Sequence, residues 1–154
     1  MMATQRKRVK EGDVLEVKVG DRFAYLQYIG KHPHYGEAML VSPMLHDRKS
    51  NVTNDLLSGA YATFYPVTAA IAQRLVEVIG HIEPVSLPRR FRRPGAMSGR
   101  RIRTWIVEGE TGEQVKSKLT EDELQLPIAT IWNHEYLVQR LQEGWSPSQE
   151  GRES

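Results

Sequence analysis

The sequence predicts an α+β protein, built on a strongly bent antiparallel sheet or a partly open β-barrel with short helices and a C-terminal helix. Segments that alternate apolar and polar residues, separated by turn residues, fill the first third of the chain. Helical spacing is confined to short stretches, chiefly 67–75 and 134–143. Successive strands with helices at particular breaks are typical of the α+β class.

Residues 13–43 predict a three-stranded antiparallel meander. Residues 13–19 (DVLEVKV) alternate apolar and polar side chains, and a Gly-Asp turn separates them from the aromatic run 22–30 (RFAYLQYIG). Bulky apolar residues on both faces of 22–30 indicate a central, well-covered strand. A loop at 31–36 (KHPHYG) then leads to a third strand at 37–43.

The middle of the chain combines turn-rich and regular segments. Residues 46–59 are polar and rich in turn formers, which predicts a long loop. We expect a strand at 60–66, a short alanine-rich helix at 67–75 and a return to strand alternation over 75–84. Three prolines and two glycines within 84–101 predict an exposed connection.

The last third begins with a predicted hairpin. Residues 102–109 alternate as a strand, ETGE supplies a tight turn, and 112–119 provide the partner strand. The apolar run 128–132 (IATIW) fits either a last strand or a packed connection. Trp132 and Trp145 are predicted to lie in the core rather than on a recognition surface.

Two helix starts follow the hairpin. Thr120 and Glu123 have the spacing of a capping box, in which each side chain satisfies a free backbone donor of the other residue. Asn133 is positioned to cap a helix over 134–143, and Gly144 to end it. The organisation predicted for the chain is a flexible basic arm at 1–12, a single domain at 13–145 and a disordered tail at 146–154.

Composition excludes several classes of protein. The 154 residues contain no cysteine, which excludes disulfide scaffolds, thiol catalysis and cysteine–zinc sites. No run of 18 apolar residues is present, so no membrane-spanning helix is predicted. The N-terminus is basic and polar without the apolar stretch of a secretory signal. We therefore expect a soluble cytoplasmic protein.

The small net charge of +2 hides a strong segregation of charge. Residues 89–103 carry seven arginines and no acid, whereas residues 108–154 carry ten acids against four basic residues. These arginines could pair with the acidic half inside the fold, dock an acidic protein, or bind a phosphate backbone with Phe91 and Trp105 stacking bases. All three interpretations remain open at the level of the sequence.

The signals for catalysis or metal binding are weak. His32 and His34 have a spacing that can ligate a metal, but no third ligand is indicated, and a solvent-facing loop turned by Pro33 accounts for them. Tyr35, in the same loop, is the aromatic residue we expect to be exposed. The sequence contains neither a G-x-S-x-G nucleophile motif nor a glycine-rich phosphate loop. We predict no catalytic residue, no metal and no cofactor.

Three stretches resemble the immunity protein 26-type domains of bacterial polymorphic toxin systems. They are the opening VKEGDVLEVKVGDRFAYLQYIG, the unit YATFYPVTAAIAQRLVEVIG and the closing LPIATIWNHEYLVQRLQEGW, which is similar to segments of related uncharacterised bacterial proteins. The residues in matching places of the opening are Gly12, Asp13, Asp21, Phe23, Ala24 and Tyr25. The resemblance implies an α+β fold and a non-enzymatic role, in which the protein binds and blocks a cognate toxin.

The function predicted is therefore that of an immunity-type protein that binds a protein partner. The 46–59 loop is expected beside the contact surface. A nucleic-acid-binding module that uses the same arginines is the alternative, and homo-oligomerisation is also left open. The residues predicted to contact the partner are Arg89, Arg90, Arg92, Arg93, Arg100, Arg101, Arg103, His34 and Tyr35.

Overall fold

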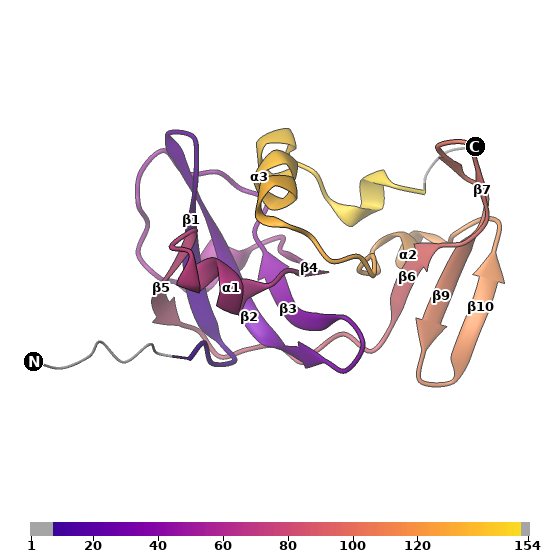
Figure 1. Cartoon of the computed structure of the whole chain (residues 1–154), viewed down its shortest axis with the longest axis horizontal. Coiled ribbons are helices and arrows are strands. Elements are labelled where there is room, and N and C mark those ends of the chain that lie inside the picture. Colours follow the sequence, from indigo (N-terminus) through magenta and orange to yellow (C-terminus); the bar gives the residue numbers. More distant parts are fainter. Residues whose placement is uncertain (1–7, 152–154) are drawn as a thin grey trace, which may run out of the picture.

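The computed structural model describes residues 8–151 and shows an α+β fold, as predicted (Figure 1). The described strands form three antiparallel sheets that do not close into a barrel. The five-stranded sheet contains β4 (Tyr61–Phe64), β3 (Gly36–Val41), β2 (Arg22–His32), β1 (Asp13–Val19) and β5 (Val76–His81), in that order. The others are a three-stranded sheet of β10 (Gly112–Lys116), β9 (Trp105–Gly109) and β6 (Phe91–Pro94), and a small hairpin of β7 (Met97–Ser98) and β8 (Arg101–Ile102).

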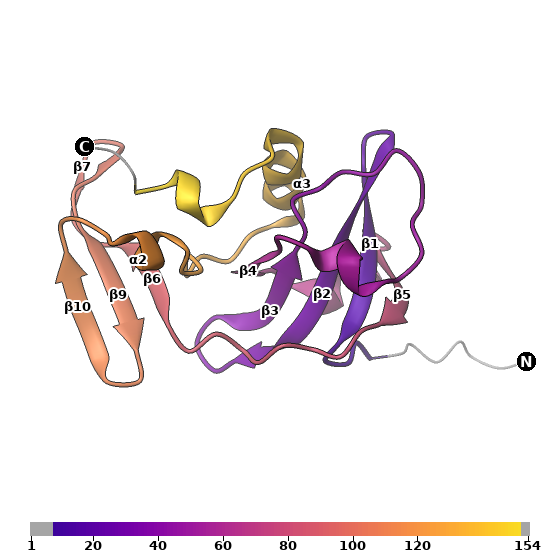
Figure 2. The same cartoon turned by 180° about the vertical axis from the view of Figure 1, so that it is seen from behind.

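The predicted N-terminal meander is confirmed, with β1 and β2 at the centre of the five-stranded sheet. β1 pairs with β2 from Val14↔Gln27 to Val19↔Arg22, and β3 pairs with the other side of β2. Both faces of β1 and β2 are buried over most of their length, which agrees with the apolar side chains on both faces of β2. This sheet forms one lobe of the molecule, and β6, β9 and β10 form the other (Figures 1 and 2).

The prediction of an exposed connection over 84–101 is wrong for residues 91–94, which form the strand β6. The arginines of this segment made it resemble a loop. Phe91 and Arg92 are both buried, and β6 pairs antiparallel with β9. The alternation that marks a strand is lost here because a buried position is filled by an arginine. The predicted hairpin of 102–109 with 112–119 is present as β9 and β10, joined at Gly109↔Gly112.

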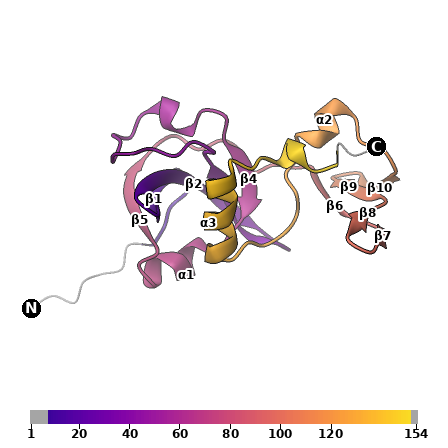
Figure 3. The same cartoon turned by 90° about the horizontal axis from the view of Figure 1, so that it is seen from above.

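The caps predicted for the last two helices are present, whereas the helix predicted over 67–75 ends at residue 72. α1 (Val67–Ala72) follows β4, and α2 (Glu121–Leu124) begins with the predicted capping box. The Asn133 side chain accepts a hydrogen bond from the backbone of Tyr136 and caps α3 (His134–Glu143). Gly144 ends α3 in the left-handed conformation, with φ 64°. α3 lies across the five-stranded sheet and buries Leu137 and Leu141 (Figure 3).

Residues 128–132 are a packed connection between the two lobes rather than a full strand. They make isolated parallel bridges to both sheets, Phe64↔Ile131 in one and Arg92↔Ile128 in the other. Trp132 is buried, as predicted, and packs edge-on against Trp145, also buried, with ring centroids 5.2 Å apart. One core cluster runs continuously from the five-stranded sheet to Trp105 and Val107 of the second sheet.

The predicted ends of the domain need correction where the structure describes them. Residues 146–151 are ordered rather than disordered: Pro147–Gln149 form the 3-10 helix η2, and Pro147 is buried. At the other end, Gly12 of the predicted arm donates its backbone N–H to the carbonyl of Tyr28 at 2.8 Å. Residues 1–7 and 152–154 lie outside the described residues.

Candidate functional site

Arg89, Arg90 and Arg93 of the arginine cluster pair with carboxylates of the acidic half of the chain. The ion pairs are Arg89 with Glu110 at 3.2 Å, Arg90 with Glu123 at 4.0 Å, and Arg93 with both Glu108 at 3.1 Å and Glu113. These arginines lie at the start of the second sheet, and the acids lie on or beside it. The interpretation of internal pairing therefore applies to these three arginines.

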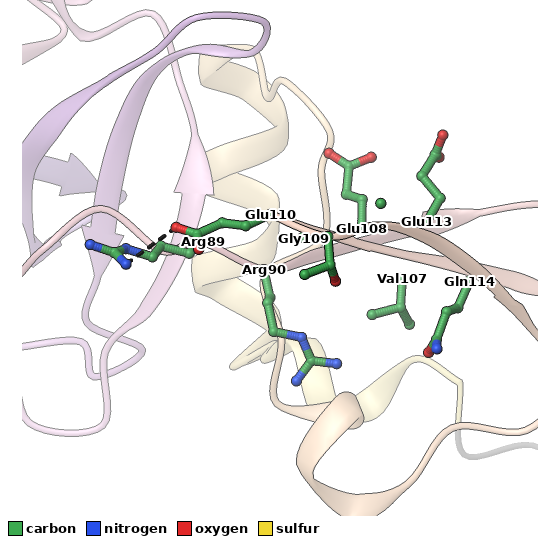
Figure 4. A pocket seen from close by; sticks show the side chains of 10 residues that line it. Arg89, Arg90, Val107, Glu108, Gly109, Glu110, Glu113 and Gln114 are labelled. Atoms are coloured by element: carbon green, nitrogen blue, oxygen red, sulfur yellow. Dashed lines mark ion pairs between the residues drawn. The ribbon is translucent and has the colours of Figure 1, made fainter.

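Several of these residues line a pocket of about 640 Å³ between residues 89–90 and the β9–β10 hairpin (Figure 4). Glu108 and Glu113 lie opposite one another on adjacent strands, where two like charges repel. Arg93 bridges both carboxylates, and its hydrogen bond to Glu108 raises the pKa of the guanidinium. The lining contains two arginines and three glutamates, and both arginines are paired with an acid, so the pocket has no excess of positive charge.

Arg92 cannot contact a partner, which corrects its assignment as a partner-binding residue. Its side chain is 0% exposed and stacks on the ring of Trp105, with the guanidinium carbon 4.3 Å from the ring centroid. Its Nη2 donates hydrogen bonds to the backbone carbonyls of Leu124 and Pro147. Burial lowers the pKa of Arg92 to about 10, so the group remains a cation at neutral pH.

The remaining three arginines lie together on the β7–β8 hairpin at the end of the second lobe. We call residues 97–103 the basic hairpin. Arg100, Arg101 and Arg103 are all exposed, and Met97 on the same hairpin is 51% exposed. Neither Arg100 nor Arg103 forms an ion pair within the described part of the chain. The basic hairpin therefore presents cationic groups beside an apolar side chain.

The predicted stacking of bases on Phe91 and Trp105 is wrong, because both rings are buried. Phe91 is 3% exposed and packs with Phe64 in a small aromatic cluster. Trp105 is 4% exposed and is covered on one face by Arg92. Neither ring offers the free face that stacking on a nucleic-acid base requires.

The expectation that Tyr35 is exposed is also wrong, since the loop at 31–36 packs against the second sheet. The hydroxyl of Tyr35 donates a hydrogen bond to Glu108 at 2.8 Å, and its ring packs against Phe64. Burial, with the hydrogen bond to Glu108, raises the pKa of Tyr35 to about 12. His32 also packs here, and burial lowers its pKa, while His34 is exposed. Tyr35 therefore helps to join the lobes.

The 46–59 loop lies at the opposite end of the molecule from the basic hairpin, so the two do not form one surface (Figures 1 and 3). The loop is tied to the sheet where Ser50 donates its backbone N–H to the hydroxyl of Tyr25, which in turn donates to Glu16. Sequence reasoning missed a Ser50–His46 side-chain pair, 3.2 Å apart, because neither residue lies in a recognisable motif. The other ring nitrogen of His46 has no hydrogen-bond partner among the described residues, so no carboxylate completes a catalytic triad.

Among residues 8–151, no group of three or more histidine, aspartate or glutamate side chains converges to hold a metal ion. No helix in this range is both long enough and apolar enough to cross a membrane. No family model, curated protein or solved structure matches the chain.

Proposed function

We propose that this protein is a cytoplasmic, non-enzymatic binding protein of immunity type, and that the basic hairpin docks an acidic surface of a cognate toxin. The observation that carries the proposal is the exposure of Arg100 and Arg103 without an intramolecular ion pair in the described chain. Arg89, Arg90 and Arg93 already have carboxylate partners, and Arg92 is buried. Unpaired guanidinium groups are the ones able to bind carboxylates of another protein.

Met97 adds an apolar contact to this surface. Protein interfaces combine a desolvated apolar centre with a charged rim, and methionine and arginine are both enriched in them. With a 51% exposed Met97 among arginines, the basic hairpin has this composition on a small scale. The charge of the hairpin would steer an acidic partner toward it and raise the association rate.

The proposal is tested by co-purifying the chain with the product of its neighbouring gene and by measuring growth of cells that express both. We expect a complex at micromolar concentration and relief of toxicity, both lost in an Arg100→Glu/Arg103→Glu variant. The matched control is Lys18→Glu/Arg48→Glu, which changes net charge equally at two exposed positions away from the hairpin. No complex with the wild-type chain would count against the proposal, as would equal losses in the two variants.

The same preparation separates a protein partner from a nucleic acid. If the arginines bound a phosphate backbone, fluorescence anisotropy of labelled single strands would rise at low salt and fall steeply as salt is added. We expect anisotropy to stay flat at physiological salt, because the aromatic rings that would stack bases are buried and the arginines of one short hairpin neutralise too few phosphates to hold a strand without them.

A further inference from the structure

The basic hairpin and the end of the described chain enclose a second pocket, of about 290 Å³. This volume is at the lower end of the roughly 300–1,000 Å³ that small-molecule sites occupy. The residues of its lining that matter for the argument are Arg100, Arg101, Arg103, Trp105, Glu150 and Gly151. They come from the hairpin, from β9 and from the segment after η2, so the pocket exists only in the folded chain.

The charges of the lining are unbalanced in favour of an anion. Arg100 and Arg103 line the pocket and form no ion pair within the described chain, and the one described carboxylate of the lining, Glu150, is already paired with Arg140 at 3.1 Å. This contrasts with the larger pocket beside Arg89, where each cation faces an acid. A ligand that carries more than one negative charge would complete the charge balance here.

A buried cation lies directly behind two walls of this pocket. Arg92 stacks on Trp105, and its Nη1 lies so close to Gly151 that a Cβ at residue 151 would be 3.1 Å away. Within the described chain, the Nε and Nη1 of Arg92 have no hydrogen-bond partner, although the side chain is fully buried. A buried charge without an ion pair is costly, and negative charge in the adjacent pocket, added to that of Glu150, which already favours the cation, would offset that cost.

We propose that the pocket between the basic hairpin and residues 149–151 binds a phosphoryl group. A phosphoryl dianion matches the excess of positive charge better than a single carboxylate does, and its oxygens suit the fork of the guanidinium. Free phosphate and a phosphorylated small molecule both carry this phosphoryl dianion. This proposal uses the same Arg100 and Arg103 as the toxin-binding proposal, but its test needs no protein partner, so the two can fail separately.

The test is a titration of the ¹⁵N-labelled full chain with inorganic phosphate, followed by NMR at constant ionic strength. We expect saturable shifts of the Trp105 indole signal and of the backbone amides of 100–103 and Gly151. Acetate at the same concentration is expected to bind at least about tenfold more weakly, since it carries one charge. A parallel titration with phosphoserine separates free phosphate from a phosphorylated small molecule as the tighter ligand.

An Arg100→Gln/Arg103→Gln variant is expected to weaken phosphate binding by roughly tenfold or more, the effect of losing a charge-assisted hydrogen bond. Both residues are exposed, so the variant should keep the spectrum of the folded protein. Lys18→Gln/Arg48→Gln is the matched control and should bind as the wild type does. The proposal is overturned if phosphate shifts do not saturate, if acetate binds equally well, or if both variants lose affinity alike.

Discussion

At the scale of single residues, Arg92 is the side chain that most affects how the sequence is interpreted. It stands in a run of arginines that predicts solvent exposure, yet it is fully buried between Trp105 and the carbonyls of Leu124 and Pro147. Its aliphatic stem and flat guanidinium serve as packing groups, while two of its three nitrogens have no hydrogen-bond partner in the described chain and only part of its burial cost is offset by the charge of Glu150. The packing of the Arg92 side chain therefore stabilises the fold, whereas the burial of its charge destabilises it.

Because the packing and the charge of Arg92 have opposite effects on stability, two substitutions at this position should have different outcomes. Arg92→Ala should lower the free energy of unfolding by about 2–4 kcal/mol, because it leaves a cavity beside Trp105. Arg92→Met should lower it less than Arg92→Ala does, because the stem is kept and the desolvated charge is removed, although the carbonyls of Leu124 and Pro147 lose their donor. Urea denaturation of both variants measures the difference. If Arg92→Met is as damaging as Arg92→Ala, the charge itself stabilises the fold.

Glu123 supplies a prediction that depends on pH. Burial alone would raise the pKa of its carboxyl group, but hydrogen bonds from Thr120 and the ammonium of Lys116 together lower it below the ordinary value. A carboxyl group whose pKa is lower in the folded state stabilises the fold above its unfolded pKa. That contribution is lost as pH falls through the folded pKa.

We therefore expect Glu123→Gln to destabilise the protein by roughly 1–2 kcal/mol at pH 7, through loss of the ion pair and weakening of the capping box. The difference from wild type should shrink as the pH is lowered from 7 to 3, because a growing fraction of the carboxyl group is then protonated. Urea denaturation at the two pH values checks this. An equal difference at both values would show that the carboxylate charge is not responsible.

At the scale of the elements, α3 has the clearest link between sequence and structure. Its start at Asn133 and its end at Gly144 are both given by local chemistry, and its buried face packs onto the five-stranded sheet. Gly144 has φ 64°, and a Cβ added there would meet no neighbour within 4 Å. The cost of a side chain at this position is therefore one of backbone conformation alone.

Gly144→Ala should accordingly lower the free energy of unfolding by about 1 kcal/mol. Gln142→Ala, at an exposed position of the same helix, serves as the control and should stay within about 0.5 kcal/mol of wild type. Thermal or urea unfolding of the pair gives the comparison. A Gly144→Ala variant as stable as the control would show that the end of α3 relaxes without cost.

The elements that the sequence predicts well are those defined by local signals. The meander of 13–43, the hairpin at 105–116 and the capped helices follow from alternation, turn residues and caps. β6 could not be predicted in this way, because its buried Arg92 breaks the apolar alternation. The order of residues 146–151 also escaped prediction, since it depends on long-range contacts such as the bond from Arg92 to Pro147.

The candidate site can be predicted only in part from the sequence, because it too depends on long-range contacts. An arginine's partners are set by the tertiary fold, so seven similar residues have three different environments. Arg89, Arg90 and Arg93 pair with acids, Arg92 is buried, and the arginines of the basic hairpin are exposed. Tyr35 was misjudged because its partner Glu108 is 73 residues away.

At the scale of the whole molecule, the segregation of charge in the sequence is only partly cancelled by folding. The ion pairs of Arg89 and Arg93 are formed with glutamates on or beside the second sheet. The basic hairpin lies beyond them, at the end of the second lobe, and is cationic (Figures 1 and 2). The 46–59 loop lies at the other end, so a single partner of moderate size would not need to reach both. Electrostatic steering toward the cationic end is the expected consequence.

The central claim is that the basic hairpin guides an acidic protein partner onto this molecule. The most direct test is the association rate with the neighbouring gene product, measured by biolayer interferometry at low and physiological ionic strength. We expect Arg100→Glu/Arg103→Glu to slow association at least about tenfold at low salt and to remove most of its salt dependence, whereas Lys18→Glu/Arg48→Glu changes it little. An unchanged rate for the hairpin variant would contradict the claim.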